Sequence, residues 1–285
     1  NQWVWKQLAE MTVPKAEDFA ADQATLLEGV KSIPVGGDIG RIVVFGPNAF
    51  PLIAPEGVKT RRGVEFDGPF CVLAAGRLGK GRVAAYSHDC WLIGANTFLN
   101  EDHPQLLDNL LRWLADRSDK SKTAPRIGLR WPDEIGKLLE QRGFTVERLT
   151  GNDWLPRLEH IDVLIALTHS TTPLMTDTEA DRIREFITRG GGLLTASSGW
   201  VWRQYIAAPD QTLGADSLAN RILGPAGILI DDGSSSFATG IAVVTPAAEA
   251  HWRLANRQHF ESSETPAAGT VKLPDSLRTF LLRSH

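Results

Sequence analysis

The chain has 285 residues, of which 42% are hydrophobic and 22% charged, so it can bury a large core in one large domain or two ordinary ones. Its formal net charge of −4 at pH 7 provides no general positive field, so we expect no nucleic-acid partner. No apolar run reaches the roughly 18 residues that a transmembrane helix needs, so we expect no membrane span.

The cysteines and the first residues bear on the cellular compartment. Cys71 and Cys90 show neither a C-x-x-C spacing nor a metal-binding pattern, and we expect both to be free. Free cysteines leave the compartment undecided. The chain begins NQWVWKQ, without an initiator Met or an apolar signal core, which is typical of a processed mature chain or an excised fragment. We expect a secreted, periplasmic or cell-surface protein, with a cytoplasmic one as the alternative.

The first 118 residues predict an N-terminal α/β lobe. The apolar spacing of residues 1–30 predicts a helix that Pro14 interrupts, and RIVVFG at 41–46 predicts a buried strand. Residues 68–88 predict two strands joined by a glycine-containing turn, that is, a hairpin. The clearest helix is 104–117, where five leucines fall on one face.

A polar segment, SDKSKTAP at 118–125, is the best candidate for a linker. Strands and helices then alternate, which favours a parallel sheet with helices on both faces and a second α/β lobe at 125–285. Thr176 or Asp177 is expected to cap the helix that Gly190 ends. The predicted strands are 126–130, 144–149, 160–168 and 192–197, with less certain ones at 227–231 and 240–245, and the predicted helices are 133–143, 176–191 and 275–284.

Two strand ends of the predicted sheet carry small polar residues, LTHSTT at 167–172 and TASSGW at 195–200. The second has the position of a nucleophile elbow with Ser197 at its tip, although Thr195 stands where the elbow pattern has glycine. A nucleophilic serine also needs a base, and His169, His251 and His259 are the candidates. Because none of them lies in a motif, we favour a structural turn over a catalytic one.

The same strand ends predict where a ligand would bind. Carboxyl ends of parallel strands meet at one rim, and hydroxyl, imidazole and indole groups there suit a sugar or an aromatic group. The alternative is that the indoles are buried and hold the C-terminal part against the sheet. The residues predicted to share this cleft are His169, Ser170, Ser197, Ser198, Trp200 and Trp202.

Two further segments have a functional and a structural interpretation. His88 and Asp89, with NEDH at 100–103, offer metal-binding side chains, but a loop closing over a helix start that Asp102 caps explains them better. The segment GRLGKGR at 76–82 has the composition of an anion cradle, but a hairpin turn explains its glycines more simply. We therefore expect neither a metal nor a cofactor.

Several blocks resemble the N-terminal region of the transient-receptor-potential (TRP) channel-associated factors. They are LLEGVKSIP (26–34), RIVVFGPNAFPLI (41–53), GKGRVAAYSHDCWL (79–92), LLDNLLRWL (106–114) and REFITRGGGLLTASSGWVW (184–202). That family joins an amidotransferase-like region to a downstream enhancin-like metallopeptidase domain. The resemblance implies that the lobe at 125–285 is flavodoxin-like and class I amidotransferase-like. It also aligns Ser197 with the catalytic Cys of class I glutamine amidotransferases, in a site that has degenerated.

The function that we expect is a non-catalytic binding or accessory module of a larger metallopeptidase-family protein, with a protein or glycan ligand. A serine-dependent or amidotransferase-like hydrolase using Ser197 is the alternative. A third possibility is a metallopeptidase whose catalytic domain follows His285. The zinc motif of the family's peptidase domain is absent from this chain, so protease activity does not carry over to it.

Overall fold

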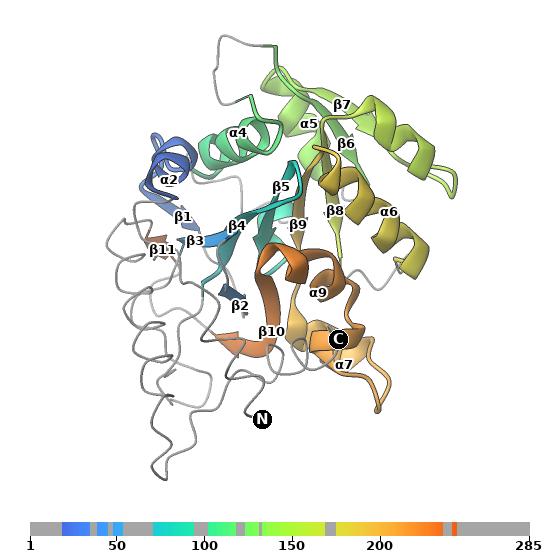
Figure 1. Cartoon of the computed structure of the whole chain (residues 1–285). Coiled ribbons are helices and arrows are strands. Elements are labelled where there is room, and N and C mark those ends of the chain that lie inside the picture. Colours follow the sequence, from blue (N-terminus) through green and yellow to red (C-terminus); the bar gives the residue numbers. More distant parts are fainter. Residues whose placement is uncertain are drawn as a thin grey trace.

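The structure is a computed structural model that describes residues 19–34, 39–44, 48–53, 71–93, 102–117, 123–130, 133–168, 175–235 and 241–243. Its centre is a seven-stranded sheet flanked by helices (Figure 1). In spatial order the strands are β3 (Ala49–Ile53), β4 (Leu73–Leu78), β5 (Gly81–Tyr86), β9 (Gly192–Ala196), β8 (Val163–Leu167), β6 (Arg126–Leu129) and β7 (Thr145–Arg148). The neighbouring pairs β3–β4 and β4–β5 are antiparallel, whereas β5–β9, β9–β8, β8–β6 and β6–β7 are parallel.

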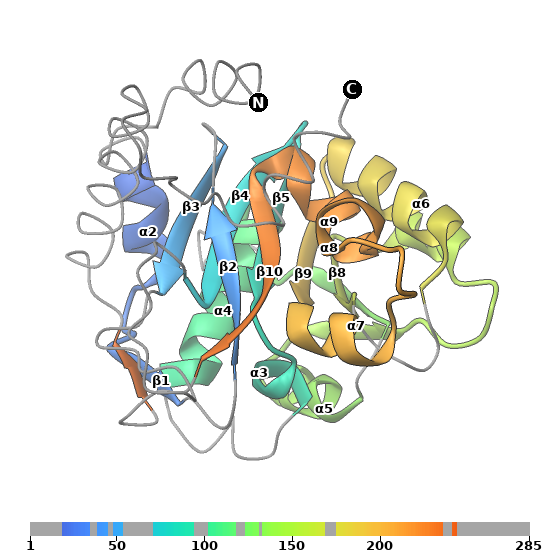
Figure 2. The same cartoon turned by 90° about the horizontal axis from the view of Figure 1, so that it is seen from below.

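Two short antiparallel ribbons join the N-terminal part of the chain to its C-terminal part. β2 (Ile39–Val44) pairs with β10 (Ile228–Ser235), and β1 (Ser32–Pro34) pairs with β11 (Ile241–Val243). Figure 2 shows β2 and β10 side by side, with α7 next to β10. The described helices are α2 (Ala20–Leu26), α3 (Cys90–Ile93), α4 (Asp102–Leu114), α5 (Glu134–Gln141), η3 (Leu155–His160), α6 (Asp177–Thr188), α7 (Gly199–Tyr205), α8 (Leu213–Asp216), α9 (Leu218–Leu223) and η4 (Gly224–Ala226).

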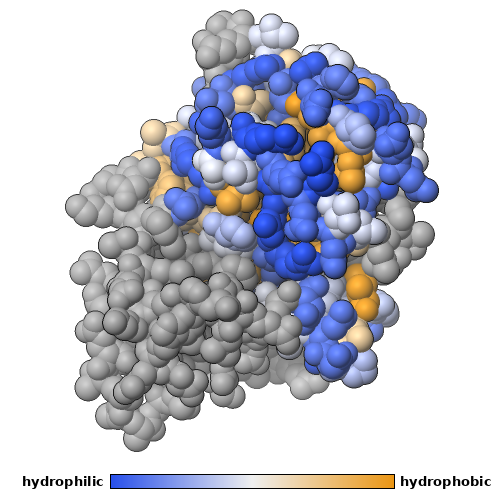
Figure 3. All heavy atoms as spheres, turned by 45° about the vertical axis from the view of Figure 1, so that its right-hand side comes forward, coloured by the Kyte–Doolittle hydropathy of each residue, from blue (hydrophilic) through white to orange (hydrophobic). Residues whose placement is uncertain are grey.

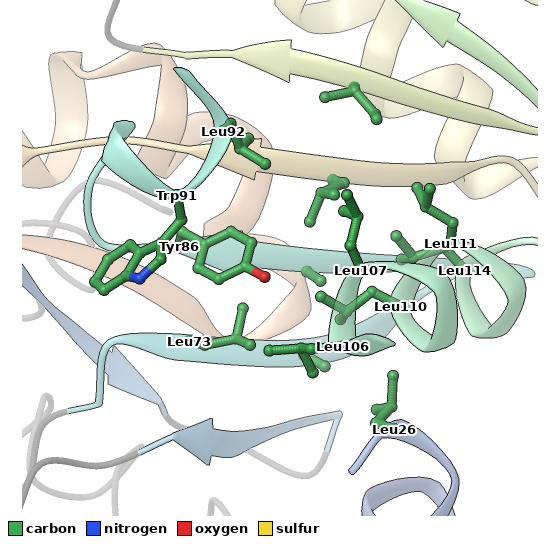
Figure 4. Packing of buried hydrophobic residues seen from close by; sticks show 14 of the residues in the cluster. Leu26, Leu73, Tyr86, Trp91, Leu92, Leu106, Leu107, Leu110, Leu111 and Leu114 are labelled. Atoms are coloured by element: carbon green, nitrogen blue, oxygen red, sulfur yellow. The ribbon is translucent and has the colours of Figure 1, made fainter. Parts of the chain in front are cut away.

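The two faces of the sheet carry separate hydrophobic clusters. Successive side chains of a strand point to opposite faces, so Ala84 and Tyr86 of β5 pack with α4, while Val83 and Ala85 pack in the cluster of α6. α4 and α6 therefore lie on opposite sides of the sheet (Figure 1). On the α4 side, its leucines interdigitate with Leu73, Tyr86 and Trp91 (Figure 4).

The triple glycine at 190–192 is explained by close packing where β9 begins. A Cβ atom on Gly192 would lie 2.8 Å from the carbonyl oxygen of Leu114 at the end of α4, and one on Gly191 would lie 2.3 Å from the ring of Phe186 on α6. Gly190 has φ +125°, which side chains disfavour. The glycines thus let helices on both faces approach the same strand.

The structure confirms the mixed α/β class with a mostly parallel sheet covered by helices. It also confirms the hairpin, as β4 and β5, and the leucine-rich helix, as α4. Thr176 caps α6 in a reciprocal capping box with Glu179. Of the helix predicted at 1–30, residues 1–18 lie outside the described residues and the later part contains α2; the helix predicted at 275–284 also lies outside them.

The division into lobes at 1–118 and 125–285 stays a prediction, and the described sheet bears on it. β5, from the first segment, pairs in parallel with β9, from the second, so one sheet continues across the predicted linker. Cys71 and Cys90 are not joined in a disulfide, as expected. In the part of the chain that the structure describes, no helix is long and apolar enough to cross a membrane.

A buried histidine in the first turn of α4 predicts a pH-dependent stability. Burial lowers the pKa of His103 from 6.5 to about 4, and Nε2 lies 3.4 Å from the Tyr86 hydroxyl. Between those pH values the unfolded chain binds a proton that the folded chain does not. The free energy of unfolding should therefore fall as pH drops from about 6.5 to about 4, by roughly 3 kcal/mol in total, and then level off.

Urea unfolding at closely spaced pH values measures this effect. The variant His103→Gln should lose this part of the pH dependence, whereas His160→Gln, at an exposed histidine of η3, should keep it. An unchanged slope in His103→Gln would show that other groups cause the acid sensitivity.

Candidate functional site

The two strand ends predicted to form a cleft are neighbours. Leu167 of β8 is in register with Ala196 of β9. The backbone N–H of Thr168 donates to the Ala196 carbonyl at 3.3 Å, and the Thr195 hydroxyl donates to that of Thr168 at 3.1 Å. His169 and Ser170, and the alternative bases His251 and His259, lie outside the described residues.

The serines of the turn after β9 are enclosed by protein. Ser197 is 1% exposed and Ser198 is fully buried. The Ser197 N–H donates to the Tyr86 carbonyl at 3.1 Å, and the Ser198 hydroxyl donates to the Ser87 carbonyl at 3.3 Å. A nucleophile elbow projects its serine from a strained turn. Among the described non-glycine residues, however, positive φ is found at Asp116 and not at Ser197.

The β2–β10 ribbon covers this turn closely. A Cβ atom on Gly40 of β2 would lie 2.3 Å from the Ser87 carbonyl oxygen and 3.6 Å from Cα of Ser198. One on Gly199 would lie 2.2 Å from the Asp231 carbonyl oxygen of β10. Asp231 also forms an ion pair with Arg41 of β2, at 2.5 Å. The small residues of TASSG therefore fit beneath a ribbon of backbone.

The two tryptophans after the turn belong to α7 and differ in exposure. Trp202 is 5% exposed and packs inward, whereas Trp200 is half-buried. The indole Nε1 of Trp200 is buried and has no hydrogen-bond partner among the described residues. The ring of His88, at the end of β5, lies with its centroid 6.1 Å from that of Trp200. The structure therefore brings His88 to this site, a neighbour that the sequence prediction missed because it follows a distant strand.

The thiols give the site no alternative nucleophile. Burial raises the pKa of Cys90 to about 12 and raises that of Cys71 as well, so both remain protonated near neutral pH. The described residues contain no group of three or more His, Cys, Asp or Glu side chains that could hold a metal ion. Asp102 belongs to the NEDH segment that the sequence offers as a candidate metal site. Its carboxylate accepts a hydrogen bond from the Lys31 N–H at 3.0 Å.

The glycine-rich segment 76–82 forms the turn of the β4–β5 hairpin. Gly79 has φ +61°, a conformation that favours glycine in such turns. The Lys80 N–H donates to the Thr188 carbonyl at 3.0 Å, which ties the turn to the end of α6. This geometry accords with the structural interpretation of the segment.

A pocket of about 580 Å³ lies at the carboxyl ends of β6 and β7, and the sequence did not indicate it. Its charged residues are scattered along the chain and look like ordinary surface charges in the sequence. Their one signal is that they lie at or near the carboxyl ends of two predicted strands, 126–130 and 144–149. The lining residues are Ile93, Leu129, Arg130, Asp133, Glu134, Arg148, Leu149 and Thr150.

The contact between the ribbon and the turn can be tested by substitution. Gly40→Ala places a methyl group against the Ser87 carbonyl, which is backbone and cannot move aside. We expect a loss of about 1–3 kcal/mol in the free energy of unfolding, measured with urea. The control is Gly136→Ala on α5, whose Cβ would meet only side-chain ends at 3.0 Å or more and should be nearly neutral. Equal stability of the two variants would show that the ribbon does not press on the turn.

Comparisons with known proteins place these features in a family. The model of a family described as "TRPM8, N-terminal domain" matches residues 3–241. TRPM8 channel-associated factor 2 of Bos taurus is 30% identical over 75% of this chain, and that of Homo sapiens is 30% identical over 65%. The chain spans 20% and 17% of their lengths, respectively.

A solved structure shares the fold. The structure of IMPa from Pseudomonas aeruginosa, in complex with an O-glycopeptide, aligns with 99% of this chain and 28% of its own, with a TM-score of 0.56 and 12% identity. This chain thus corresponds in fold to one part of a longer protein.

Proposed function

Because the chain belongs to the family of TRPM8 channel-associated factor N-terminal domains, we propose that it is a non-catalytic binding or accessory module. In this proposal its parallel strands form a flavodoxin-like, amidotransferase-like fold whose catalytic turn has degenerated. The observation that carries the proposal is the burial of Ser197, at a position without positive φ. A serine that substrate cannot reach cannot act as a nucleophile, even where the sequence aligns it with a catalytic residue.

The likeness to a metallopeptidase concerns the larger protein. IMPa is a metallopeptidase that has been solved with an O-glycopeptide, and the family relatives are channel-associated factors. These facts support a protein or glycan ligand for this module and a peptidase domain elsewhere in the same protein. Secretion or display at the cell surface would suit such a target. A downstream H-E-x-x-H motif in the complete gene would support this arrangement, and a gene without one would contradict it.

Catalysis at Ser197 is the rival that experiment must exclude. The 285-residue chain is treated with a fluorophosphonate probe and assayed for glutaminase activity, beside the variants Ser197→Ala and Ser198→Ala. We expect the three proteins to give the same background in both assays. Labelling or turnover that Ser197→Ala alone abolishes would overturn the non-catalytic proposal.

A ligand at this rim is predicted to contact His169, Ser170, Ser197, Ser198, Trp200 and Trp202. Among those that the structure describes, Ser197, Ser198 and Trp202 are buried, so the proposal rests on the half-buried Trp200, which tests it best. As a half-buried indole it can offer part of its flat face to a ligand, so Trp200→Ala should weaken binding of an O-glycopeptide several-fold while the melting temperature changes little. Tyr205→Ala removes a 69%-exposed aromatic ring from the same helix and serves as the matched control.

Replacing Trp202, in contrast, is expected to change the stability of the fold rather than ligand binding. Its side chain is 5% exposed, so Trp202→Ala should cost about 3–5 kcal/mol of stability and report on packing rather than on the ligand. If Trp200→Ala and Tyr205→Ala bind the glycopeptide as tightly as the unmodified chain, this rim is not the binding surface.

A further inference from the structure

The pocket at the ends of β6 and β7 has the position at which α/β sheets bind ligands. From β6 the chain passes through α5 to β7, whereas the next strand, β8, lies on the other side of β6. α5 and η3 pack into the clusters on opposite faces of the sheet. The strand order thus reverses between β6 and β8, and the pocket lies next to that point, at the carboxyl ends of β6 and β7, on the edge where open parallel sheets bind ligands. The volume of about 580 Å³ is within the range of small-molecule sites.

Arg130 gives the pocket a fixed positive group. Its backbone N–H extends the β6–β8 pairing by donating to Ile165, at 2.9 Å. Its guanidinium lies 5.1 Å from the centroid of the Trp154 ring, and Nη1 donates to the Leu149 carbonyl at 3.1 Å. The side chain is 14% exposed. Stacking and partial burial thus hold the guanidinium in place before any ligand arrives.

The nearest carboxylate does not saturate Arg130. Glu179 lies 3.9 Å from Nη2, too far for a hydrogen bond. Its oxygens already accept bonds from the Trp154 indole at 2.7 Å and from the Thr176 N–H at 2.7 Å. A guanidinium has five N–H donors, and one of those of Arg130 bonds to an acceptor that the structure describes. Donors therefore remain for a carboxylate.

Arg148, the other cation of the pocket, has a structural role. Its Nε donates to Asp133 at 2.5 Å and its Nη1 to Glu140 at 2.6 Å. These bonds balance its charge and fix Asp133 beside the pocket. Arg130 is thus the cation available to an anionic ligand.

The remaining lining selects the rest of the ligand. Asp133 and Glu134 present carboxylate oxygens, which accept hydrogen bonds from hydroxyl groups, and Thr150 adds a hydroxyl. Leu129 and Leu149 form buried apolar walls. The lining holds two guanidinium groups and two carboxylates, so it offers no excess positive charge to a ligand with several anionic groups. A ligand with one carboxylate, several hydroxyls and an apolar C–H face would complement the guanidinium, the polar side chains and the apolar walls of the pocket.

We propose that this pocket binds a hydroxylated carboxylic acid of the size of an acidic sugar, with the ligand carboxylate on Arg130. The inference goes beyond the proposed function and does not depend on whether Ser197 reacts. In this arrangement Asp133, Glu134 and Thr150 bind the hydroxyls, while Leu129 and Leu149 contact the C–H face.

Titration of the 285-residue chain, followed by ligand-observed NMR and calorimetry, tests the proposal. The probes are the methyl glycosides of N-acetylneuraminic acid and glucuronic acid, with methyl galactoside as the neutral sugar and glutamate as the acid that lacks hydroxyls. We expect at least one acidic sugar to bind at millimolar concentration or below, with methyl galactoside and glutamate at least tenfold weaker.

Two variants locate the site. Arg130→Met should raise the Kd of the acidic sugar at least tenfold, whereas Arg126→Met, at the opposite end of the same strand, should leave it unchanged. Since Arg130 also packs on Trp154, Thr150→Trp provides a second test, because Thr150 is exposed and a large side chain there fills the pocket without touching the core. Circular dichroism confirms that each variant is folded.

Binding that Thr150→Trp blocks and Trp200→Ala leaves intact supports this pocket rather than the rim beside α7. The proposal is overturned if neither acidic sugar binds, if methyl galactoside binds equally well, or if folded Arg130→Met and Thr150→Trp both bind like the unmodified chain.

Discussion

The parallel pairing of β5 with β9 holds the two parts of the main sheet together. On one side of it lie the antiparallel strands β3 and β4, and on the other the parallel strands β8, β6 and β7. α4 packs over this pair on one face and α6 on the other, and both approach closely because residues 191 and 192 lack side chains. Any side chain there would separate a helix from the sheet.

The same pairing explains why the turn after β9 is closed. It sets Ser197 beside the end of β5, where its N–H is bonded to Tyr86. β2 and β10 then pass over the turn, with Gly40 and Gly199 at the points of closest approach. On the face shown in Figure 3, the described residues are mainly hydrophilic, with separate hydrophobic areas among them. Because Gly40 and Gly199 bring backbone against backbone here, access to the turn after β9 is limited by backbone packing rather than by a removable side chain.

The sequence predicts those elements whose signal lies within a short window. The leucine stripe of α4, the glycine turn after β4 and the capping residue of α6 each depend on neighbours a few positions away. The pairings of β5 with β9 and of β2 with β10 depend on residues far apart in the chain, and no local pattern encodes them. For the same reason TASSGW indicates a strand end but not its burial under β10.

The candidate sites also depend on contacts between residues far apart in the chain, which no local sequence pattern predicts. The adjacency of the two strand ends was predictable from parallel topology, whereas the position of His88 beside Trp200 was not. Arg130 and Arg148 are indistinguishable as letters, yet one stacks on an indole with donors to spare and the other is held by two carboxylates. That difference exists only once β6 and β7 lie side by side.

The distance along the chain between β5 and its partner has a consequence for synthesis on the ribosome. Arg82 is in register with Gly192, which is made 110 residues later. At about 5–20 residues per second, the hairpin of β4 and β5 waits roughly 5–20 s with an unpaired edge that carries Val83, Ala84 and Ala85. Such an edge is a template for association between nascent chains. A contact that makes the finished sheet continuous thus leaves its growing form open to aggregation.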